Sequence, residues 1–297
     1  MGKITNLPYS ANSDQNYGDK SVLEEVVLPD TIKNIPSWSF QNCSALTKCY
    51  IPQTIVSMGE SIFRDSVNLS GDIFLPNLTS MNHYVFTNTS IESFSANSLT
   101  ELIGVDNSIG GPFANCKRLK SVELSSVTSI GPRAFYGCVN LESIKCELVE
   151  KIETFAFYNC TALKVDLILP SLITLDIGAF IMSGVKSIIA KGLETINGVN
   201  SSNRGAFEKC NDLTFVELKA ISKIGPRAFY GCKNLQRIII NNTTPPTLEN
   251  TNALIDTNNC PIYVPDASVT DYREASNWSA YADRIYPMSV YESGGKQ

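Results

Sequence analysis

Apolar and polar residues alternate in short stretches that recur along most of the chain. In residues 141–146, Leu-Glu-Ser-Ile-Lys-Cys, for example, the last three residues are apolar, polar and apolar in turn. A period of two is typical of a β-strand with one buried face. The pattern predicts ten short strands stacked in parallel. Their inward-facing pairs are Val26/Leu28, Cys49/Ile51, Ile73/Leu75, Phe94/Ala96, Val122/Leu124, Ile144/Cys146, Leu167/Leu169, Ile188/Ala190, Val216/Leu218 and Ile238/Ile240.

An aromatic position precedes each predicted strand and divides the sequence into units of 22 to 27 residues. A repeat of this length indicates stacked supersecondary units, each of which buries its apolar face against its neighbours. The position is occupied by Tyr17, Phe40, Phe63, Phe86, Phe113, Phe135, Phe157, Phe180, Phe207 and Phe229.

A second, longer period lies over the first. Phe63 and Phe157 are 94 residues apart, as are the next three aromatic pairs, and residues 130–138 are identical in sequence to residues 224–232. We infer that a block of four units was copied as a whole.

The rest of each unit must return the chain to the start of the next strand. Pro29, Pro52, Pro76 and Pro170 directly follow their strands and are expected to end them, since proline cannot donate to a sheet ladder. The Ala-Phe-x-x-Cys segment predicts a single helical or 3₁₀ turn with its aromatic ring directed inward.

Six of the nine cysteines occupy one repeat position, three residues after the aromatic. Because Ser66, Thr89 and Ser183 occupy the same slot in other units, the slot is expected to select a small residue, and we interpret the cysteines as buried free thiols. Disulfides between neighbouring units stay open as an alternative. A zinc site is not expected, because the chain has one histidine and no Cys-x-x-Cys pair.

Composition and charge narrow the class of partner. The net charge is −5 and no run of Lys and Arg occurs, which argues against nucleic acid as a partner. No apolar stretch approaches the roughly 20 residues of a transmembrane helix, and the first residues lack the pattern of a signal peptide. From the sequence, the protein either stays inside the cell or begins after a signal peptide has been removed.

The repeat motif Ile-Gly-x-x-Ala-Phe-x-x-Cys-x-x-Leu-x-x-Ile/Val-x-Leu-Pro resembles that of the BspA-like leucine-rich-repeat family of bacterial surface proteins. The resemblance covers residues 17–240. It implies a right-handed, curved solenoid of about ten rungs, mostly β with short helical or 3₁₀ turns, whose parallel sheet forms the concave face. Family members are associated with attachment to host proteins or to other cells.

The ends of the array are expected to differ from its middle. Residues 1–16 are read as an N-terminal segment, 17–240 as the solenoid, and 241–297 as a C-terminal cap and tail. In the cap, residues 262–265 resemble a strand. The apolar residues Val269, Tyr272 and Ala275 then recur at helical spacing, which predicts a helix with Asp266 or Ser268 as its N-cap.

No constellation of catalytic residues is found. The single histidine, His83, lies in a predicted exposed turn, and the glycines at 110–111 have no lysine beside them to form a phosphate loop. We therefore expect neither an enzyme nor a bound cofactor or metal.

Binding is better supported than catalysis, because the residue between each inward pair must face outward. These residues, here named the outward column, are Val27, Tyr50, Phe74, Ser95, Glu123, Lys145, Ile168, Ile189, Glu217 and Ile239. The column is apolar at several positions, which is typical of a partner site, although β-propensity alone also places such residues on strands. The residues predicted to contact a partner are Val27, Tyr50, Phe74, Glu123, Lys145, Ile168 and Ile189.

Two longer units offer a second candidate surface. Their extra residues fall in 104–112 and 198–206, equivalent loops that serve either as binding loops or as tolerated insertions. The sequence thus predicts a non-enzymatic module at the cell surface or outside the cell. Its partner is predicted to be a protein or a glycan, and host and matrix proteins are among the candidate partners. The alternative is a scaffold or spacer in a larger surface assembly.

Overall fold

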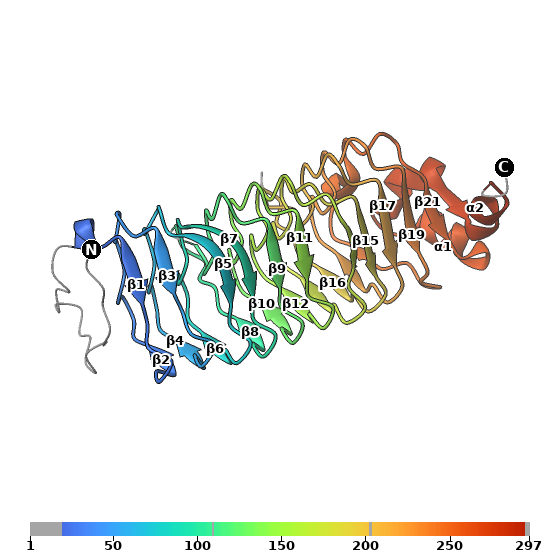
Figure 1. Ribbon diagram of the computed structural model, residues 1–297. Coiled ribbons are helices and arrows are strands. Elements are labelled where there is room, and N and C mark those ends of the chain that lie inside the picture. The colour runs from blue at the N-terminus through green and yellow to red at the C-terminus, as the bar shows by residue number, and fades with distance from the viewer. Residues whose placement is uncertain (1–19, 109, 202–203, 295–297) are drawn as a thin grey trace. The chain divides into compact units, whose positions relative to one another are not determined.

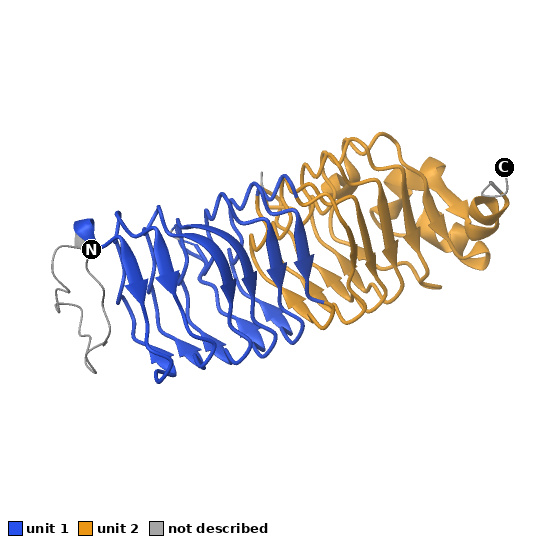
Figure 2. Cartoon of the chain, viewed as in Figure 1, with its two compact units in different colours: residues 1–146, 159–162 blue, residues 147–158, 163–297 orange. Residues whose placement is uncertain are grey.

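A computed structural model describes residues 20–108, 110–201 and 204–294, so the predictions for Tyr17 and residues 1–16 lie outside the described residues. The chain is a parallel β-solenoid of about 11 turns, which confirms the predicted repeat architecture. It divides into two compact units (Figure 2). Unit 1 contains residues 1–146 and 159–162, and unit 2 contains residues 147–158 and 163–297.

In unit 1, the predicted strands form parallel ladders, β1 with β3 and β5-β7-β9-β11 (Figure 1). The register is that of the repeat, with Val26 opposite Cys49 and Val122 opposite Ile144. The strands are β1 (Glu25–Val27), β3 (Lys48–Tyr50), β5 (Ser70–Phe74), β7 (Ser90–Ser95), β9 (Ser121–Glu123) and β11 (Ser143–Lys145).

A second set of strands was not predicted, because each has only two residues and two residues carry no period. The second residue of each is apolar and buried. In unit 1 they pair as β2-β4-β6 and as β8-β10. They are β2 (Asn34–Ile35), β4 (Ser57–Met58), β6 (Ser80–Met81), β8 (Glu101–Leu102) and β10 (Ser129–Ile130).

Unit 2 repeats both sets of strands. The longer ones pair in the order β13-β15-β17-β19-β21-β22, and β21 and β22 extend the ladder beyond residue 240. They are β13 (Asp166–Ile168), β15 (Ser187–Ala190), β17 (Phe215–Leu218), β19 (Arg237–Ile240), β21 (Ile262–Val264) and β22 (Ile285–Pro287). The two-residue strands are β12 (Lys151–Ile152), β14 (Thr174–Leu175), β16 (Thr195–Ile196), β18 (Lys223–Ile224) and β20 (Thr247–Leu248).

The repeat aromatics stack into a buried row inside each unit. In unit 1 the rings of Phe113 and Phe135 are 5.3 Å apart and nearly parallel, and in unit 2 Phe207 and Phe229 have the same separation. All four side chains are 0% exposed. The rows form the wall of the core opposite the strands. Burying each such side chain contributes about 1.5–3 kcal/mol to the stability of the fold.

The segment around each aromatic differs from the predicted helical or 3₁₀ turn. It consists of hydrogen-bonded turns in which the residue two positions after the aromatic, and in most units also the residue two positions before it, adopts left-handed backbone, as at Trp38 (φ 59°) and Asn42 (φ 60°) around Phe40. Their N–H groups donate to carbonyls of the next turn, with Phe40 N bonded to Ile62 O at 2.9 Å. Satisfying the backbone between turns replaces the bonds within a helix.

The cysteine slot is occupied by a hydrogen-bond donor, not merely by a small residue. In unit 1 the Cys138 thiol donates to the carbonyl of Phe113 at 3.0 Å, and the Ser66 hydroxyl donates to that of Phe40 at 2.7 Å. In unit 2 the Cys232 thiol donates to the carbonyl of Phe207 at 3.0 Å. Cys, Ser and Thr are interchangeable here because each has a short side chain that donates to a buried carbonyl. All nine cysteines are described, and all are thiols rather than disulfides.

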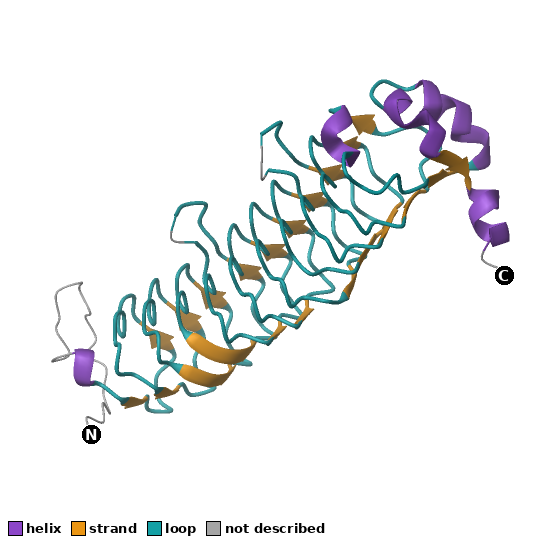
Figure 3. Cartoon of the chain, turned by 90° about the horizontal axis from the view of Figure 1, so that it is seen from above, coloured by secondary structure: helices purple, strands orange, loops and turns teal. Residues whose placement is uncertain are grey.

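The helices of unit 2 gather after residue 250 (Figure 3). The strand predicted near 262–265 is β21, and the predicted helix is α1 with Tyr272 buried, but Ser268 does not cap it. Its hydroxyl donates instead to the Thr243 carbonyl at 2.7 Å, and the Asp266 carboxylate accepts from the Ser289 N–H. The helical segments are η1 (Lys20–Val22) in unit 1 and η2 (Thr251–Leu254), η3 (Asp266–Ser268), α1 (Val269–Glu274), η4 (Trp278–Arg284) and α2 (Met288–Gly294) in unit 2.

A few side chains differ from the predicted burial. Cys49, Ile51 and Ile144 are only half-buried, although the alternation predicted them inside. Ile239, predicted to face outward, is 6% exposed. Its partners in register are Glu217 and Tyr263, whose longer side chains flank it on both sides.

Candidate functional site

The outward column of unit 1 begins with three apolar side chains on successive turns. Val27 ends β1 and pairs in register with Tyr50 at the end of β3. Phe74 ends β5, whose first residue, Ser70, donates its N–H to Thr47 of the preceding turn. Tyr50 is 55% exposed and Phe74 50% exposed, while Val27 is half-buried. Such exposure of two neighbouring aromatic positions leaves a large apolar area in water.

An extra residue in β5 accompanies the exposure of Phe74. The spacing from Leu69 to Ile73 is one residue longer than that from Leu46 to Cys49, and the register against β7 shifts between Gly71 and Asp72. Gly71 has φ 98°, which favours glycine. At this shift the unpaired residue is Glu92 of β7, which lies between Ile91, opposite Gly71, and Ser93, opposite Asp72. Such a β-bulge bends the bulged strand locally.

The longer spacing recurs 94 residues later, from Leu163 to Leu167, without a register shift against β15. In unit 1 the Ser93 hydroxyl donates to the Asp72 carboxylate at 2.5 Å, and in unit 2 Ser187 donates to Asp166 at 2.7 Å. The residue after the lengthened stretch is Ile168 in unit 2, and it is 60% exposed. Both copies therefore present an exposed apolar side chain at this point, aromatic in one and aliphatic in the other.

The outward column of unit 1 continues as a polar row. The Lys145 ammonium lies 2.6 Å from the Glu123 carboxylate, and the Ser95 hydroxyl donates to the same carboxylate at 3.5 Å. The hydrogen bond from Lys145 and its positive charge lower the pKa of Glu123. The two side chains are 63% and 42% exposed, so the pair is a solvated feature that contributes little to stability.

In unit 2, the predicted column residues differ in exposure. Ile168 and Ile189 are opposite each other in register, Ile168 largely exposed and Ile189 half-buried. Glu217 follows, with the Lys191 ammonium 3.7 Å from its carboxylate. The column residues thus form one set within unit 1 and a second set within unit 2.

An aromatic cluster at the end of unit 2 was missed by the sequence reasoning. Tyr263 and Tyr286 continue the outward column on β21 and β22, and Tyr291 of α2 packs on Tyr263 with ring centroids 5.2 Å apart. The Arg237 guanidinium lies 4.6 Å from the ring centre of Phe215 and 5.5 Å from that of Tyr291. Extending the alternation to residues 262–264 and 285–287 would have identified the two column tyrosines.

Arginines anchor the two inserted loops within their own units. In unit 1, Arg133 Nε lies 3.0 Å from the Asp106 carboxylate of loop 104–112. In unit 2, Arg227 binds the buried carboxylate of Glu208 through two hydrogen bonds of 3.0 and 2.6 Å. Glu208 also accepts the backbone N–H groups of Arg204 and Gly205. Residues 109, 202 and 203 lie outside the described residues.

The single histidine is not the exposed turn residue that was predicted. His83 is half-buried, because its Nε2 lies 3.2 Å from the Glu60 carboxylate and its ring packs edge-on against Tyr84. Across residues 20–108, 110–201 and 204–294, no group of three or more His, Cys, Asp or Glu side chains is placed to hold a metal ion. In the same ranges no helix has the length and apolar character needed to cross a membrane.

The repeat sequence matches a known protein family. The sequence matches the family described as the BspA type leucine-rich repeat region, over residues 13–109, 107–199 and 200–270. No curated protein gives a significant match.

Solved structures of bacterial proteins also match this chain. A leucine-rich repeat protein from Bacteroides ovatus is 19% identical with a TM-score of 0.54, over 96% of this chain and 91% of that chain. A leucine-rich cell surface protein from Faecalibacterium prausnitzii is 20% identical with a TM-score of 0.40, over 94% and 90%. The pneumococcal vaccine antigen PcpA is 17% identical with a TM-score of 0.44, over 89% and 66%. At these identities the likeness to the Bacteroides protein shows the fold alone.

Proposed function

Because the chain belongs to the BspA-type leucine-rich-repeat family, we propose that it is a non-enzymatic binding module of the bacterial cell surface. Its ligand is a protein or glycan held on the outward column, with a host or matrix protein as the preferred class. The family match supports a repeat that serves molecular interaction, and the column supplies the surface. The surface location is tested by antibody labelling of intact cells.

The observation that carries this proposal is the exposure of Tyr50 and Phe74 on neighbouring turns of unit 1. Apolar side chains on a strand ladder are held in fixed positions, so a partner that covers them loses little additional conformational freedom of the site. Each aromatic ring moved out of water contributes about 1.5–3 kcal/mol. The solvated Glu123–Lys145 pair lies on the same column and supplies a polar rim of the kind that surrounds such contacts.

A contact inside unit 2 supports the same use of this face. Tyr291 of α2 packs against Tyr263 and lies within 5.5 Å of the Arg237 guanidinium, so the chain itself places an aromatic side chain on the outward side of β19 and β21. A scaffold that only spaces other parts has no need for exposed aromatic residues on its strands.

The test is the double variant Tyr50→Ala/Phe74→Ala in a binding assay against purified extracellular-matrix proteins and a glycan panel. Truncation of two central contacts should weaken binding by about 30-fold or more, since each costs at least about 1 kcal/mol. The matched control is Leu148→Ala, an apolar residue of similar exposure (52%) in a turn of unit 2. It should bind like the unchanged chain.

Thermal melts of all three proteins should agree closely, because none of these side chains is buried. Equal binding by the double variant and the control would reject the column as the site and favour the scaffold role. A large loss of melting temperature in the double variant would instead place Tyr50 and Phe74 in the core.

A further inference from the structure

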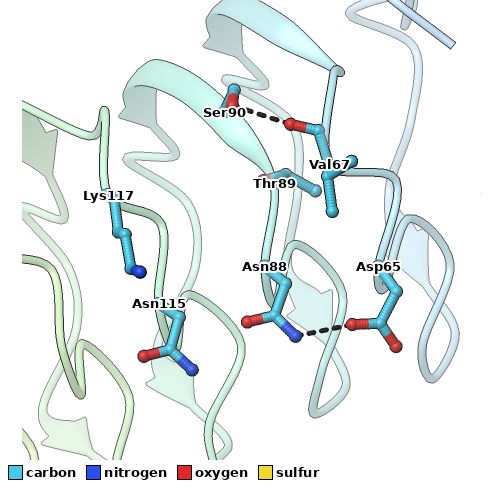
Figure 4. Close-up of a pocket in the computed structure, with 7 residues that line it drawn as sticks. All are labelled: Asp65, Val67, Asn88, Thr89, Ser90, Asn115 and Lys117. Carbon is cyan, nitrogen blue, oxygen red and sulfur yellow. Dashed lines mark hydrogen bonds between the residues drawn. The ribbon is translucent and has the colours of Figure 1, made fainter. Parts of the chain in front are cut away.

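A pocket of about 420 Å³ opens in unit 1 across three successive turns, on the segment that follows the aromatic row. In Figure 4, Val67 and Lys117 lie on opposite sides, and Asp65, Asn88 and Asn115 follow one another along the lower edge. Its lining residues are Asp65, Val67, Asn88, Thr89, Ser90, Asn115 and Lys117. The volume is within the range of sites that hold small molecules.

The pocket arises where the middle turn is one residue short. Ser66 is followed by a buried Leu69 and Cys116 by a buried Leu119, whereas Thr89 is followed by the buried Ile91, two positions on. The middle turn therefore lacks the residue that its two neighbours place at the surface. Its floor is closed by Thr89, which is 3% exposed. The Ser90 hydroxyl donates to the Val67 carbonyl at 2.7 Å.

Several polar groups around the pocket already have partners. The Asp65 carboxylate accepts from the Asn88 amide at 2.5 Å and lies 3.1 Å from Arg64 Nε, so its charge is compensated. The Thr89 hydroxyl donates to the Phe86 carbonyl at 2.8 Å. These contacts fix the wall of the pocket and leave little of that wall for a ligand.

Other groups are available to a ligand. Within the part of the chain that the structure describes, the Lys117 ammonium has no acidic partner and the Asn115 side-chain amide no hydrogen bond. Asn88 donates through its nitrogen, and its Oδ1 stays available as an acceptor. Val67 adds an apolar wall that is 48% exposed. The free chemistry is one cation, two amide groups and one small apolar face.

We propose that this pocket binds an acidic sugar residue, either a uronate or a sialic-acid-type residue. The carboxylate would bind the Lys117 ammonium, a charge-assisted contact about twice as strong as a neutral hydrogen bond. Ring hydroxyls, which both donate and accept, match the amide of Asn115 and the Oδ1 of Asn88. The C–H face of the ring would lie on Val67. The site is separate from the outward column and does not depend on its function.

The second copy of the block argues that this chemistry is not required by the repeat. The residues 94 positions later are Thr161 for Val67, Met182 for Asn88, Lys209 for Asn115 and Asn211 for Lys117. The shortened turn is kept in that copy, where Val185 follows Ser183 by two positions. The short turn is thus common to both copies. The second copy exchanges the positions of the lysine and the amide, and the amide of Asn88 and the apolar wall of Val67 are present in the first copy only.

The proposal is tested by titrating the full chain with 3′-sialyllactose, a glucuronate-terminated disaccharide and neutral lactose, followed by saturation-transfer NMR and calorimetry. One or both acidic probes should bind, and lactose should bind at least about tenfold more weakly, because it lacks the carboxylate. Whichever acidic probe binds identifies the source of the carboxylate.

Two variants locate the site. Lys117→Gln should weaken binding by about tenfold or more, and Asn88→Met/Lys117→Asn, which imports two residues of the second copy and leaves Asn115 in place, should abolish it. The matched control is Lys233→Gln, since Lys233 follows Cys232 as Lys117 follows Cys116 and is exposed. The proposal would be overturned by any one of four results. Lactose could bind as well as the acidic probes, or Lys117→Gln could bind as the unchanged chain does. An acidic peptide could bind in preference to the sugars, or neither acidic probe could bind at millimolar concentration.

Discussion

The buried ion pair in unit 2 should be the largest single polar contribution to the stability of that unit. The perturbation is Glu208→Ala. It removes a carboxylate that is 0% exposed, together with two hydrogen bonds to Arg227, whose side chain is 15% exposed. It also leaves the N–H groups of Arg204 and Gly205 without their acceptor. The bond to Glu208 raises the pKa of Arg227. Arg227 would keep its charge without that bond, because the ordinary pKa of an arginine is already far above neutral pH.

The expected loss in the free energy of unfolding comes from the unpaired charge that Glu208→Ala leaves on Arg227. Removing one partner of a buried pair typically costs about 3–5 kcal/mol, because the other charge remains without compensation. Arg133, the residue of unit 1 equivalent to Arg227, supplies the comparison, because its carboxylate partner Asp106 is 49% exposed. Asp106→Ala should cost no more than about 1 kcal/mol, because water replaces the lost partner. Both substitutions remove the carboxylate that an arginine of the repeat binds. They differ in burial and in the two backbone N–H groups that only Glu208 accepts.

The assay is urea unfolding followed by far-UV circular dichroism, with each unit fitted as its own transition if two are seen. A rescue variant sharpens it. The residue equivalent to Asp106 in unit 2 is Asn200, so Asn200→Asp added to Glu208→Ala should return part of the lost stability by giving Arg227 the partner that Arg133 has. Losses for Glu208→Ala and Asp106→Ala that are equal, and both below about 1 kcal/mol, would refute the reasoning.

Two further predictions concern the thiol slot. Cys138→Ser keeps a donor for the Phe113 carbonyl and should change the free energy of unfolding by less than about 1 kcal/mol. Cys138→Ala leaves that carbonyl without its donor and should cost about 1–3 kcal/mol in the same assay. The reverse order would mean that size alone selects the residue. Burial raises the pKa of Cys116 and of Cys210 from 9.0 to about 12. The unfolded chain therefore releases thiol protons first, and the urea midpoint should fall as pH rises from about 9 toward 12; a flat midpoint over this range, or rapid labelling of the folded chain by a thiol reagent, would contradict this.

Alternation was enough to predict which strand residues face outward at Tyr50, Phe74 and Ile168, because a period of two is imposed by strand geometry itself. It failed at Ile239, whose exposure depends on the size of the side chains beside it in register, Glu217 and Tyr263. Sequence position fixes the direction of a side chain. The neighbouring turns decide how much of it water reaches.

Features that arise between turns were harder to predict. The two-residue strands such as Asn34–Ile35 have no internal period, and the donor role of Cys138 becomes visible only when the carbonyl of Phe113 is placed beside it. The pocket beside Ser90 left a signal in the sequence, the short spacing from Thr89 to Ile91, but its meaning required the flanking turns. Tyr291 could not be assigned to the outward face before α2 was seen to pack there.

Bonding from each turn to the next also bears on how such a gene changes length. The donors of one turn are satisfied by carbonyls of the adjoining turn, so an array with whole turns added or removed leaves no new polar group without a partner. Residues 130–138 and 224–232 are identical, and where their codons also agree, the two DNA segments that encode them can recombine unequally. An exchange there would insert or delete 94 residues and keep every strand in register. Variants of this protein within one bacterial population should therefore differ in reach by whole four-turn blocks.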